Sequence, residues 1–365
     1  MSRPARIIID LAAIQANFRF AQALAPSSKT VAVVKADAYG HGSVEVTKAL
    51  EQQVDMFAVS CLEEAMVLRE NGLIKPILLL EGCFEKTELN VAYDNHCELV
   101  LHSLSQLTHL LNATFAGPIN VWLKIDTGMH RLGISLEDVE SSYEKLKASE
   151  KVKNILLMTH FAYADELSGE YTTKQIRLFE QCIQPIITNA KQKVALSMAN
   201  SAGLLAWQQT RLDWNRPGIM LYGLSPFDVP QGQAEQLIPA MTFESQVIAL
   251  REVSTGESVG YGCTWKAQRP SVIATIAVGY GDGYPRTAES GTPVLINHQR
   301  APLAGRVSMD MISVDVTELT NVKVGDTAQL WGKALSANEV ASWAGTSGYE
   351  LVTRMPRRIT RHFVD

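Results

Sequence analysis

Short apolar runs recur along the first 220 residues, and segments with helical periodicity separate most of them. The run at 31–34 (VAVV) is typical, because it is rich in β-branched residues and ends at a lysine. Such runs predict strands that are buried on both faces. Eight of them occur, at 31–34, 56–59, 77–80, 98–101, 121–125, 155–158, 195–198 and 219–222. Eight strands alternating with helices predict an α/β fold, a parallel (β/α)8 TIM barrel.

The segments between these runs have the spacing of amphipathic helices. The predicted helices lie at 44–52, 61–70, 136–148, 172–190 and 202–207. Asp10 precedes another apolar-periodic segment, and we expect it to be the N-cap of a helix over 11–24.

The pattern changes after Pro239. Further apolar runs lie at 247–250, 272–278, 294–296, 312–316 and 327–330, separated by Gly, Pro and Asp, and only 337–344 has helical spacing. This pattern predicts a mostly β, largely antiparallel C-terminal domain. We therefore expect the barrel to span residues 8–235 and the β domain to span 236–365, with residues 1–7 packing against the β domain.

Composition narrows the functional classes. A length of 365 residues suits about two domains. A hydrophobic content of 46%, with 19% charged residues, is ordinary for a soluble enzyme, and the net charge of −5 argues against nucleic-acid or membrane partners. The N-terminus lacks a secretory signal pattern, and the five scattered cysteines lack metal-ligand spacing. We expect a cytoplasmic protein without a metal site.

Polar and cationic residues follow several of the predicted strands. The residues after the strands are Lys35, Tyr39, Lys124, Arg131, His160, Asn200 and Ser201, and the eighth strand is introduced by Arg216, Gly218 and Ile219. Function in this fold is located at the carboxyl ends of the strands. We therefore expect these residues to surround a small molecule that carries an anionic group.

A phosphate site is a recurrent feature after strands seven and eight of such barrels. Ser201 can donate its hydroxyl there, and Gly218 permits close approach of the backbone to an oxyanion. A lysine beside a phosphate site suggests a Schiff base to a phosphorylated aldehyde such as pyridoxal 5'-phosphate. Each residue alone also has an ordinary interpretation: a helix cap at Ser201, a turn at Gly218, and a solvated lysine at Lys35.

Seven motifs together resemble the alanine racemase family. They are VVKADAYGHG at 33–42, KIDTGMHRLG at 124–133, NS at 200–201, RPG at 216–218, GYG at 260–262, GYGDG at 279–283 and GRVSMD at 305–310. The motifs occur in the family's order and extend over nearly the whole chain.

The resemblance implies a role for each residue. Lys35 would bind pyridoxal phosphate covalently and act as one catalytic base, and Tyr261, from the partner subunit of a homodimer, would be the opposing base. The phosphate would be held by Tyr39, Ser201, Gly218, Ile219 and Tyr349, next to Asn200. The substrate would be bound by Arg131 and by the partner's Met309, beside Asp310, and Tyr280 would narrow the entrance.

Three further residues complete the implied site. Arg216 would face the pyridine nitrogen with His160 behind it. A guanidinium has no acceptor, so it can only donate to an unprotonated nitrogen, which limits the flow of charge into the ring. Lys124 lies near Arg131 in sequence, and carbamylation would turn it into an anion that orients this arginine.

The implied activity is interconversion of L- and D-alanine, which supplies D-alanine for peptidoglycan. A racemase of broad specificity is an alternative, and the size of the pocket would decide between them. A decarboxylase on the same scaffold is disfavoured by Arg216 and Tyr261, since it needs neither an arginine at the ring nitrogen nor a second base. A non-catalytic pyridoxal phosphate carrier would not need the β domain.

Overall fold

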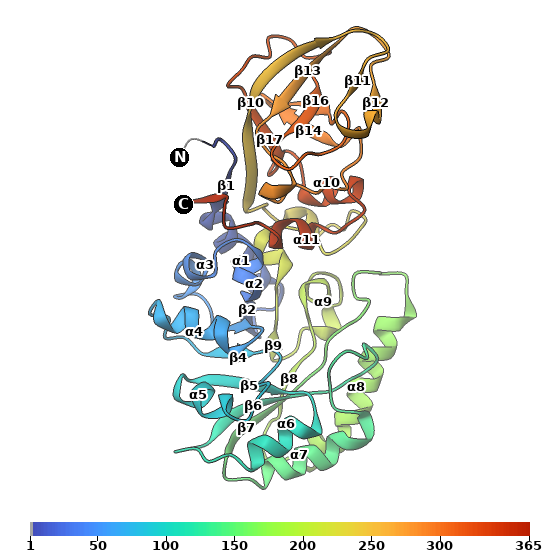
Figure 1. Cartoon of the computed structure of the whole chain (residues 1–365). Coiled ribbons are helices and arrows are strands. Elements are labelled where there is room, and N and C mark those ends of the chain that lie inside the picture. The colour runs from blue at the N-terminus through green and yellow to red at the C-terminus, as the bar shows by residue number, and fades with distance from the viewer. Residues whose placement is uncertain (1–2) are drawn as a thin grey trace.

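Eight parallel strands form the barrel in the computed structural model, which describes residues 3–365 (Figure 1). The strands are β2 (Lys29–Val33), β3 (Met56–Val59), β4 (Ile77–Leu79), β5 (Cys97–Leu101), β6 (Ile119–Lys124), β7 (Val152–Met158), β8 (Ala195–Ser197) and β9 (Trp214–Asn215). Their order is β8-β7-β6-β5-β4-β3-β2-β9. This arrangement confirms the TIM-type barrel that the sequence predicts.

Helices alternate with these strands and lie outside the barrel (Figure 1). They are α1 (Leu11–Leu24), α3 (Ser43–Leu50), α4 (Leu62–Glu70), α5 (Glu88–Asp94), α6 (Leu104–Leu111), α7 (Val139–Lys147), α8 (Glu170–Asn189) and α9 (Ser201–Ala206). The side chain of Asp10 accepts a hydrogen bond from the backbone of Ala13 at 2.8 Å, so the predicted N-cap of α1 is confirmed.

The eighth strand differs from the prediction. The apolar run 219–222 is not a strand but the 3-10 helix η3 (Ile219–Tyr222), and all four of its residues are buried. The strand lies earlier, at β9, where Lys29 and Thr30 pair with Trp214 and Asn215. A short apolar run shows that a segment is buried, but its periodicity cannot separate a strand from a helix.

The seam between β8 and β9 is closed by isolated hydrogen bonds rather than by a strand ladder. Ser197 Oγ donates to the carbonyl of Trp214 at 2.7 Å, and the backbone N–H of Leu196 donates to Asp213 at 2.9 Å. Just beyond the strand, the N–H of Arg216 donates to the carbonyl of Ala199 at 3.0 Å. The barrel is therefore nearly closed.

The β domain is built on a second sheet in the order β15-β14-β17-β10-β1-β18, with β13 pairing to both β10 and β16. Its strands are β10 (Met241–Val253), β13 (Ser271–Ile276), β14 (Pro293–Ile296), β15 (Gln299–Pro302), β16 (Ile312–Asp315), β17 (Thr327–Trp331) and β18 (Thr360–Val364). The hairpin β11 (Ser258–Val259) and β12 (Trp265–Lys266) projects from it, and the helices α10 (Ala337–Trp343) and α11 (Gly348–Thr353) complete it. The predicted β content is confirmed, and α11 is a helix that the sequence pattern did not indicate.

The first strand of the chain, β1 (Arg6–Asp10), lies inside this second sheet. It pairs antiparallel with β10 and parallel with β18, so that Arg6 opposes both Glu244 and Thr360. Of residues 1–7, which we expected to pack with the β domain, residues 1 and 2 lie outside the described part of the chain. The paired strands β1 and β18, from the beginning and the end of the described chain, lie at the junction of the units (Figure 1).

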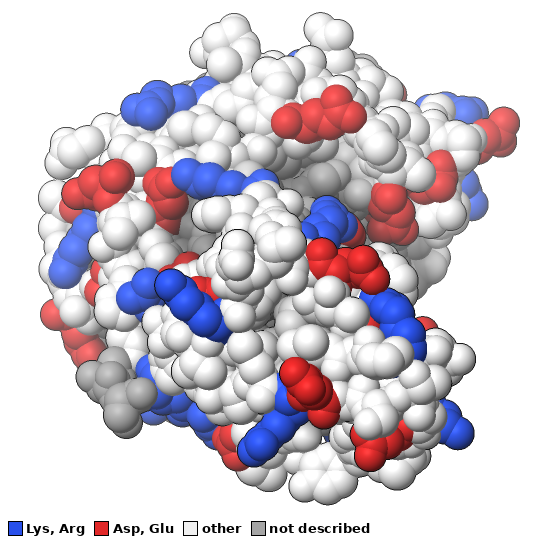
Figure 2. All heavy atoms as spheres, turned by 90° about the horizontal axis from the view of Figure 1, so that it is seen from above, with Lys and Arg blue, Asp and Glu red and all other residues white. Residues whose placement is uncertain are grey.

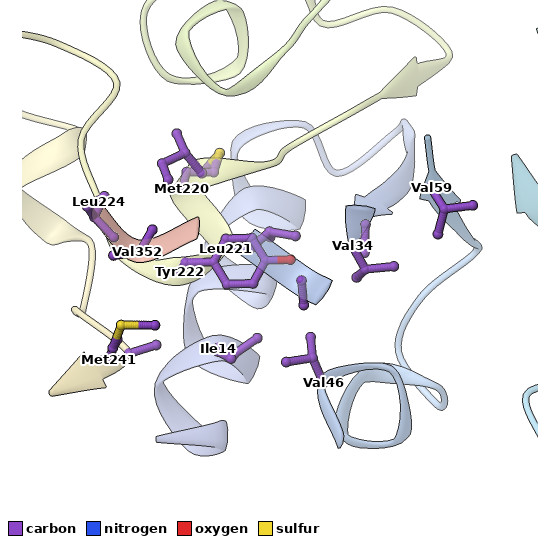
Figure 3. Packing of buried hydrophobic residues seen from close by; sticks show 14 of the residues in the cluster. Ile14, Val34, Val46, Val59, Met220, Leu221, Tyr222, Leu224, Met241 and Val352 are labelled. Carbon is purple, nitrogen blue, oxygen red and sulfur yellow. The ribbon is translucent and has the colours of Figure 1, made fainter. Parts of the chain in front are cut away.

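The junction has a continuous hydrophobic core. Figure 3 shows Tyr222 of η3 with its ring between Ile14 of α1 and Val34 at the end of the first barrel strand. The phenol hydroxyl donates to the carbonyl of Val33 at 2.9 Å. Val352 of α11 belongs to the same cluster, so the β domain packs directly behind the first barrel strand.

The surface shows no extended area of one charge on the face drawn in Figure 2, where acidic and basic side chains alternate. Within residues 3–365, no helix combines the length and the apolar character needed to cross a membrane.

Candidate functional site

A cavity of about 420 Å³ lies at the carboxyl ends of the barrel strands. It is lined by Val33, Lys35, Tyr39, Leu80, Glu81, Lys124, Arg131, Leu132, Met158, His160, Asn200, Ser201, Arg216, Gly218, Ile219 and Tyr349. Eleven of the residues singled out from the sequence are therefore brought together. Four lining residues are Lys or Arg and one is a carboxylate, so the cavity favours an anionic ligand.

Lys35 enters the cavity from an unusual backbone segment. Ala36, Asp37, Ala38 and Tyr39 all have φ between 53° and 55°, followed by Gly40 at 80°. We call 36–40 the left-handed turn. Each non-glycine residue in this conformation costs about 1–2 kcal/mol, so the surrounding structure must hold it.

Arg216 is almost fully buried, at 4% exposure. Its guanidinium donates to the carbonyls of Thr159 at 2.6 Å and Met198 at 3.1 Å, and to the hydroxyl of Ser197. Burial lowers the pKa of Arg216 to about 10, so it remains charged at neutral pH. No carboxylate in the described chain pairs with it, and its position is fixed by neutral oxygens alone.

Burial and the positive charges that line the cavity lower the pKa values of Lys124 and His160. The pKa of Lys124 falls to about 8 because of burial and because of the neighbouring Arg216 and Arg131. The pKa of His160 lies well below its usual value, again through burial first and then through Arg216 and Lys124. His160 is therefore neutral at physiological pH, and Lys124 is unusually ready to lose its proton.

Hydrogen-bond donors for a phosphate gather on one wall of the cavity. Ser201 Oγ accepts from the N–H groups of Gly218 at 2.9 Å and Met220 at 3.4 Å, so one hydroxyl and two amides converge there. Burial raises the pKa of Tyr39 to about 12, and the pKa of Tyr349 is raised for the same reason. Both phenols therefore keep their protons and can donate to an anion.

Ser201 and Gly218, which also have ordinary interpretations as a helix cap and a turn, can now be judged from their contacts. The cap of α9 is Asn200, whose side chain accepts from Gly203 N at 2.9 Å, so the hydroxyl of Ser201 is not used as the cap. A Cβ on Gly218 would lie 2.6 Å from the hydroxyl of Tyr39, so a side chain at this position would displace the phenol.

Apart from Tyr349 of α11, the predicted residues of the β domain do not line this cavity. Tyr261, Tyr280 and Met309 lie on the surface, with exposures of 71%, 40% and 53%. Tyr261 lies between β11 and β12, and this hairpin lies away from the barrel of its own chain (Figure 1).

A network of charged groups holds two of the exposed segments together. The N–H groups of Tyr280 and Gly281 donate to the carbonyls of Ser308 and Met309 at 3.0 and 2.8 Å. The fully buried Asp282 below them contacts Arg3 and Arg358, and Arg358 also pairs with Asp310 at 2.7 Å.

Glu81 is the cavity residue that the sequence analysis missed. It accepts from the hydroxyl of Ser60 at 2.7 Å, and its negative charge opposes the loss of positive charge from Lys124. It follows β4, so the rule that found the other strand-end residues could also have found it.

A larger hollow of about 610 Å³ lies at the opposite mouth of the barrel. Its polar groups already bond to one another: both carboxylate oxygens of Glu98 accept at 2.7 Å, one from Asn120 and the other from Trp122. Polar groups that already bond to one another in this way are typical of a structural region rather than of a ligand site.

No cluster of His, Cys, Asp and Glu suited to a metal ion occurs among residues 3–365.

Comparison with known proteins places the chain in a family. The family profile described as "Alanine racemase, N-terminal domain" matches residues 9–226, and "Alanine racemase, C-terminal domain" matches 240–363. The alanine racemase of Pseudoalteromonas atlantica is 51% identical, with all of both chains covered. The catabolic alanine racemase of Pseudomonas putida is 47% identical over 99% of each chain.

Solved structures agree with these matches. The biosynthetic alanine racemase from Pseudomonas aeruginosa superposes with a TM-score of 0.95 at 45% identity, covering 100% of both chains. The alanine racemase from Acinetobacter baumannii gives a TM-score of 0.93 at 39% identity, over 99% of this chain and 100% of the other. The chain described here therefore belongs to the alanine racemase family.

Proposed function

We propose that this protein is a pyridoxal-phosphate-dependent racemase that interconverts L- and D-alanine. The observation that carries the proposal is that Lys35 lines a positively charged cavity together with donors for a phosphate and with the buried guanidinium of Arg216. The chain's membership of the alanine racemase family supports the same activity.

The residues present fit pyridoxal phosphate. The phosphate would be held by Tyr39, Ser201, Gly218, Ile219 and Tyr349, beside the Asn200 cap. Gly218 fits this role because its missing side chain leaves the phenol of Tyr39 in place. The ring nitrogen would face Arg216, which can donate but not accept a hydrogen bond.

When bound through Lys35, pyridoxal phosphate supplies an electron sink that makes the α-hydrogen of an amino acid acidic. Lys35 would remove or return the proton at the α-carbon on one face. Two bases on opposite faces achieve racemisation without turning the substrate over. We assign the second base to Tyr261, supported by neutral His160 and by Arg216.

Tyr261 would come from the partner subunit of a homodimer. This assignment rests on its exposure and on the position of its hairpin, far from the barrel of its own chain (Figure 1). The exposed Tyr280 and Met309 would enter the partner's site with it, Tyr280 narrowing the entrance. We further propose that the division between the units falls near residue 235, and that the enzyme works in the cytoplasm and supplies D-alanine for peptidoglycan.

The carboxylate of the substrate would be bound by Arg131 and by the backbone of Met309 from the partner, next to Asp310. Lys124 is the neighbour that could disturb Arg131. We propose that its amine reacts with CO2, forming an N–C bond and releasing a proton, to give an anionic carbamate. A pKa near 8 favours this reaction, because only the neutral amine attacks CO2.

The direct test is incubation of purified protein with L-alanine, followed by chiral analysis of the products. Appearance of D-alanine in the presence of pyridoxal phosphate is expected, and its absence would refute the proposal. Borohydride reduction should fix the cofactor to Lys35 and to no other lysine. The Tyr261→Phe change should slow proton exchange from one enantiomer far more than from the other, whereas the control Tyr163→Phe, at an exposed position outside the cavity, should change neither.

A further inference from the structure

The left-handed turn 36–40 carries one residue of the cavity and directly follows another. Lys35 precedes it, Tyr39 is its fourth residue, and both line the cavity. The position of both side chains therefore depends on a backbone conformation that these residues do not adopt unaided. The turn has no glycine before Gly40 to reduce this cost.

Hydrogen bonds within the turn account for part of its stability. The N–H of Ala38 donates to Val34 at 2.9 Å, and that of Gly40 donates to Ala36 at 3.0 Å. The ring of His41 bonds through Nδ1 to the carbonyl of Tyr39 at 2.9 Å. These local bonds close the loop, but they leave the N–H of Ala36 and the carbonyl of Gly40 for partners outside the turn.

Glu64 of α4 binds the first end. Its Oε1 accepts from the N–H of Ala36 at 2.7 Å, and its Oε2 accepts from the N–H of Ser60 at 2.8 Å. One carboxylate therefore ties the residue next to Lys35 to the loop that follows β3. Hydrogen bonds to an ionised acceptor are stronger than those between neutral groups.

Arg361 of β18 binds the second end. Its Nε donates to the carbonyl of Gly40 at 3.0 Å, and its Nη2 lies 3.3 Å from a carboxylate oxygen of Asp37. The other oxygen of Asp37 accepts from the N–H of Ser43 at 2.8 Å, at the start of α3. Arg361 belongs to the β domain, and α11 also touches the turn, since a Cβ on Gly40 would lie 2.0 Å from the carbonyl oxygen of Val352.

We propose that Glu64 and Arg361 are positioning residues for the site: together they hold the left-handed turn and so set where Lys35 and Tyr39 face the cavity. Neither residue lines the cavity, so each acts through the backbone. Through Arg361, the last strand of the β domain fixes the cofactor lysine of its own chain. We call Glu64 and Arg361, with their contacts to the turn, the clamp. The proposal rests on the proposed function for the identity of the ligand, whereas the contacts of the clamp do not depend on that identity.

The first experiment needs no cofactor. Hydrogen exchange of the amides of Ala36 and Gly40 is measured in cofactor-free Glu64→Ala and Arg361→Ala. We expect exchange at these amides to become about tenfold faster, which is the effect of losing one to two hydrogen bonds. Arg300→Ala is the matched control, because it removes an ion pair within the β domain, where the guanidinium bonds to Glu339 and not to the turn. Unchanged exchange in both clamp variants would overturn the proposal.

The second experiment measures positioning. The Kd of pyridoxal phosphate is determined on the same proteins well below their melting temperatures. We expect a rise of roughly five- to tenfold in each clamp variant, with a shifted absorbance maximum of the bound cofactor, and no change in Arg300→Ala. Faster exchange with an unchanged Kd would show a purely structural clamp and would overturn the positioning role.

Two variants keep the test decisive. If Glu64→Ala fails to fold, Glu64→Gln replaces it, since its amide keeps only one of the two acceptor oxygens and sets an NH2 donor against the other N–H group. Arg361→Lys retains a charge near Asp37 but cannot make both contacts, so its Kd should fall between wild type and Arg361→Ala. Failure of the wild-type protein to bind pyridoxal phosphate would refute the proposed function, while hydrogen exchange would still test the clamp.

Discussion

The Gly218→Ala change tests whether Gly218 and Tyr39 belong to the proposed phosphate site. The added Cβ would lie 2.6 Å from the hydroxyl of Tyr39 and 3.2 Å from its Cζ. An ordinary contact is about 3.5 Å, so the phenol must retreat by about 1 Å. Its ring is stacked on Tyr222 at a centroid distance of 5.0 Å, which limits any retreat on that side. The hydroxyl should therefore leave its place beside the phosphate.

The expected magnitude follows from the lost hydrogen bond. A hydrogen bond to a charged group is worth about 1.5–3 kcal/mol, which corresponds to a rise of about 10- to 150-fold in the Kd of pyridoxal phosphate. The assay is titration of cofactor-free protein, followed by absorbance. Gly232→Ala is the control, because a Cβ added to Gly232 would meet no atom within 4 Å and the backbone there has no positive φ.

A double substitution isolates the cause. In the Tyr39→Phe protein the hydroxyl is gone, so Gly218→Ala should weaken binding by less than about threefold further. Equal losses with and without the hydroxyl would refute the steric argument and would place the effect in the backbone of the loop. Melting curves of all four proteins show whether a loss of stability has contributed.

Three further outcomes are expected. Arg216→Glu should raise the share of turnovers that end in transamination, measured as pyruvate formed per racemisation; an unchanged ratio would contradict the role of the guanidinium. Lys124→Met should destabilise the protein at neutral pH if Lys124 is a carbamate that orients Arg131. If Lys124 is instead a bare amine, its pKa is about 8 in the folded protein and 10.5 in the unfolded chain. The unfolded chain then binds more protons between these two pH values. The stability of the wild type should therefore rise relative to that of Lys124→Met as the pH increases from about 8 to 10.5. Asp282→Asn removes a buried charge held by two arginines, so it should loosen the Tyr280 segment and raise KM several-fold more than it lowers kcat, as steady-state kinetics would show.

Much of the fold followed from hydrophobic pattern alone. Seven of the barrel strands lie where apolar runs predict them, since a strand buried on both faces is a nearly continuous apolar run. The eighth could not be placed in this way, because β9 is only Trp214–Asn215 and the neighbouring run at 219–222 is a buried 3-10 helix. β1 and β18 were also missed, because their pairing joins opposite ends of the chain.

The candidate site was also predictable in part from the sequence. The rule that chemistry lies at the carboxyl ends of the strands found Lys35 and most of the polar residues that line the cavity, whereas Tyr349 came only from the family resemblance and Glu81 was missed. It could not find the left-handed turn, since Ala36–Tyr39 contains no glycine to signal a positive φ. It also could not find Glu64 and Arg361, whose contacts are set by tertiary packing rather than by local sequence.

The placement of β1 has a consequence for synthesis on the ribosome. Arg6–Asp10 is synthesised before both of its neighbours in the sheet, because β10 follows the entire barrel and β18 is made later still. During translation this apolar strand must remain unpaired while the barrel forms behind it. An unpaired strand of this kind is prone to aggregation. A chaperone that shields the nascent N-terminus should therefore raise the yield of native protein more than one that acts after release.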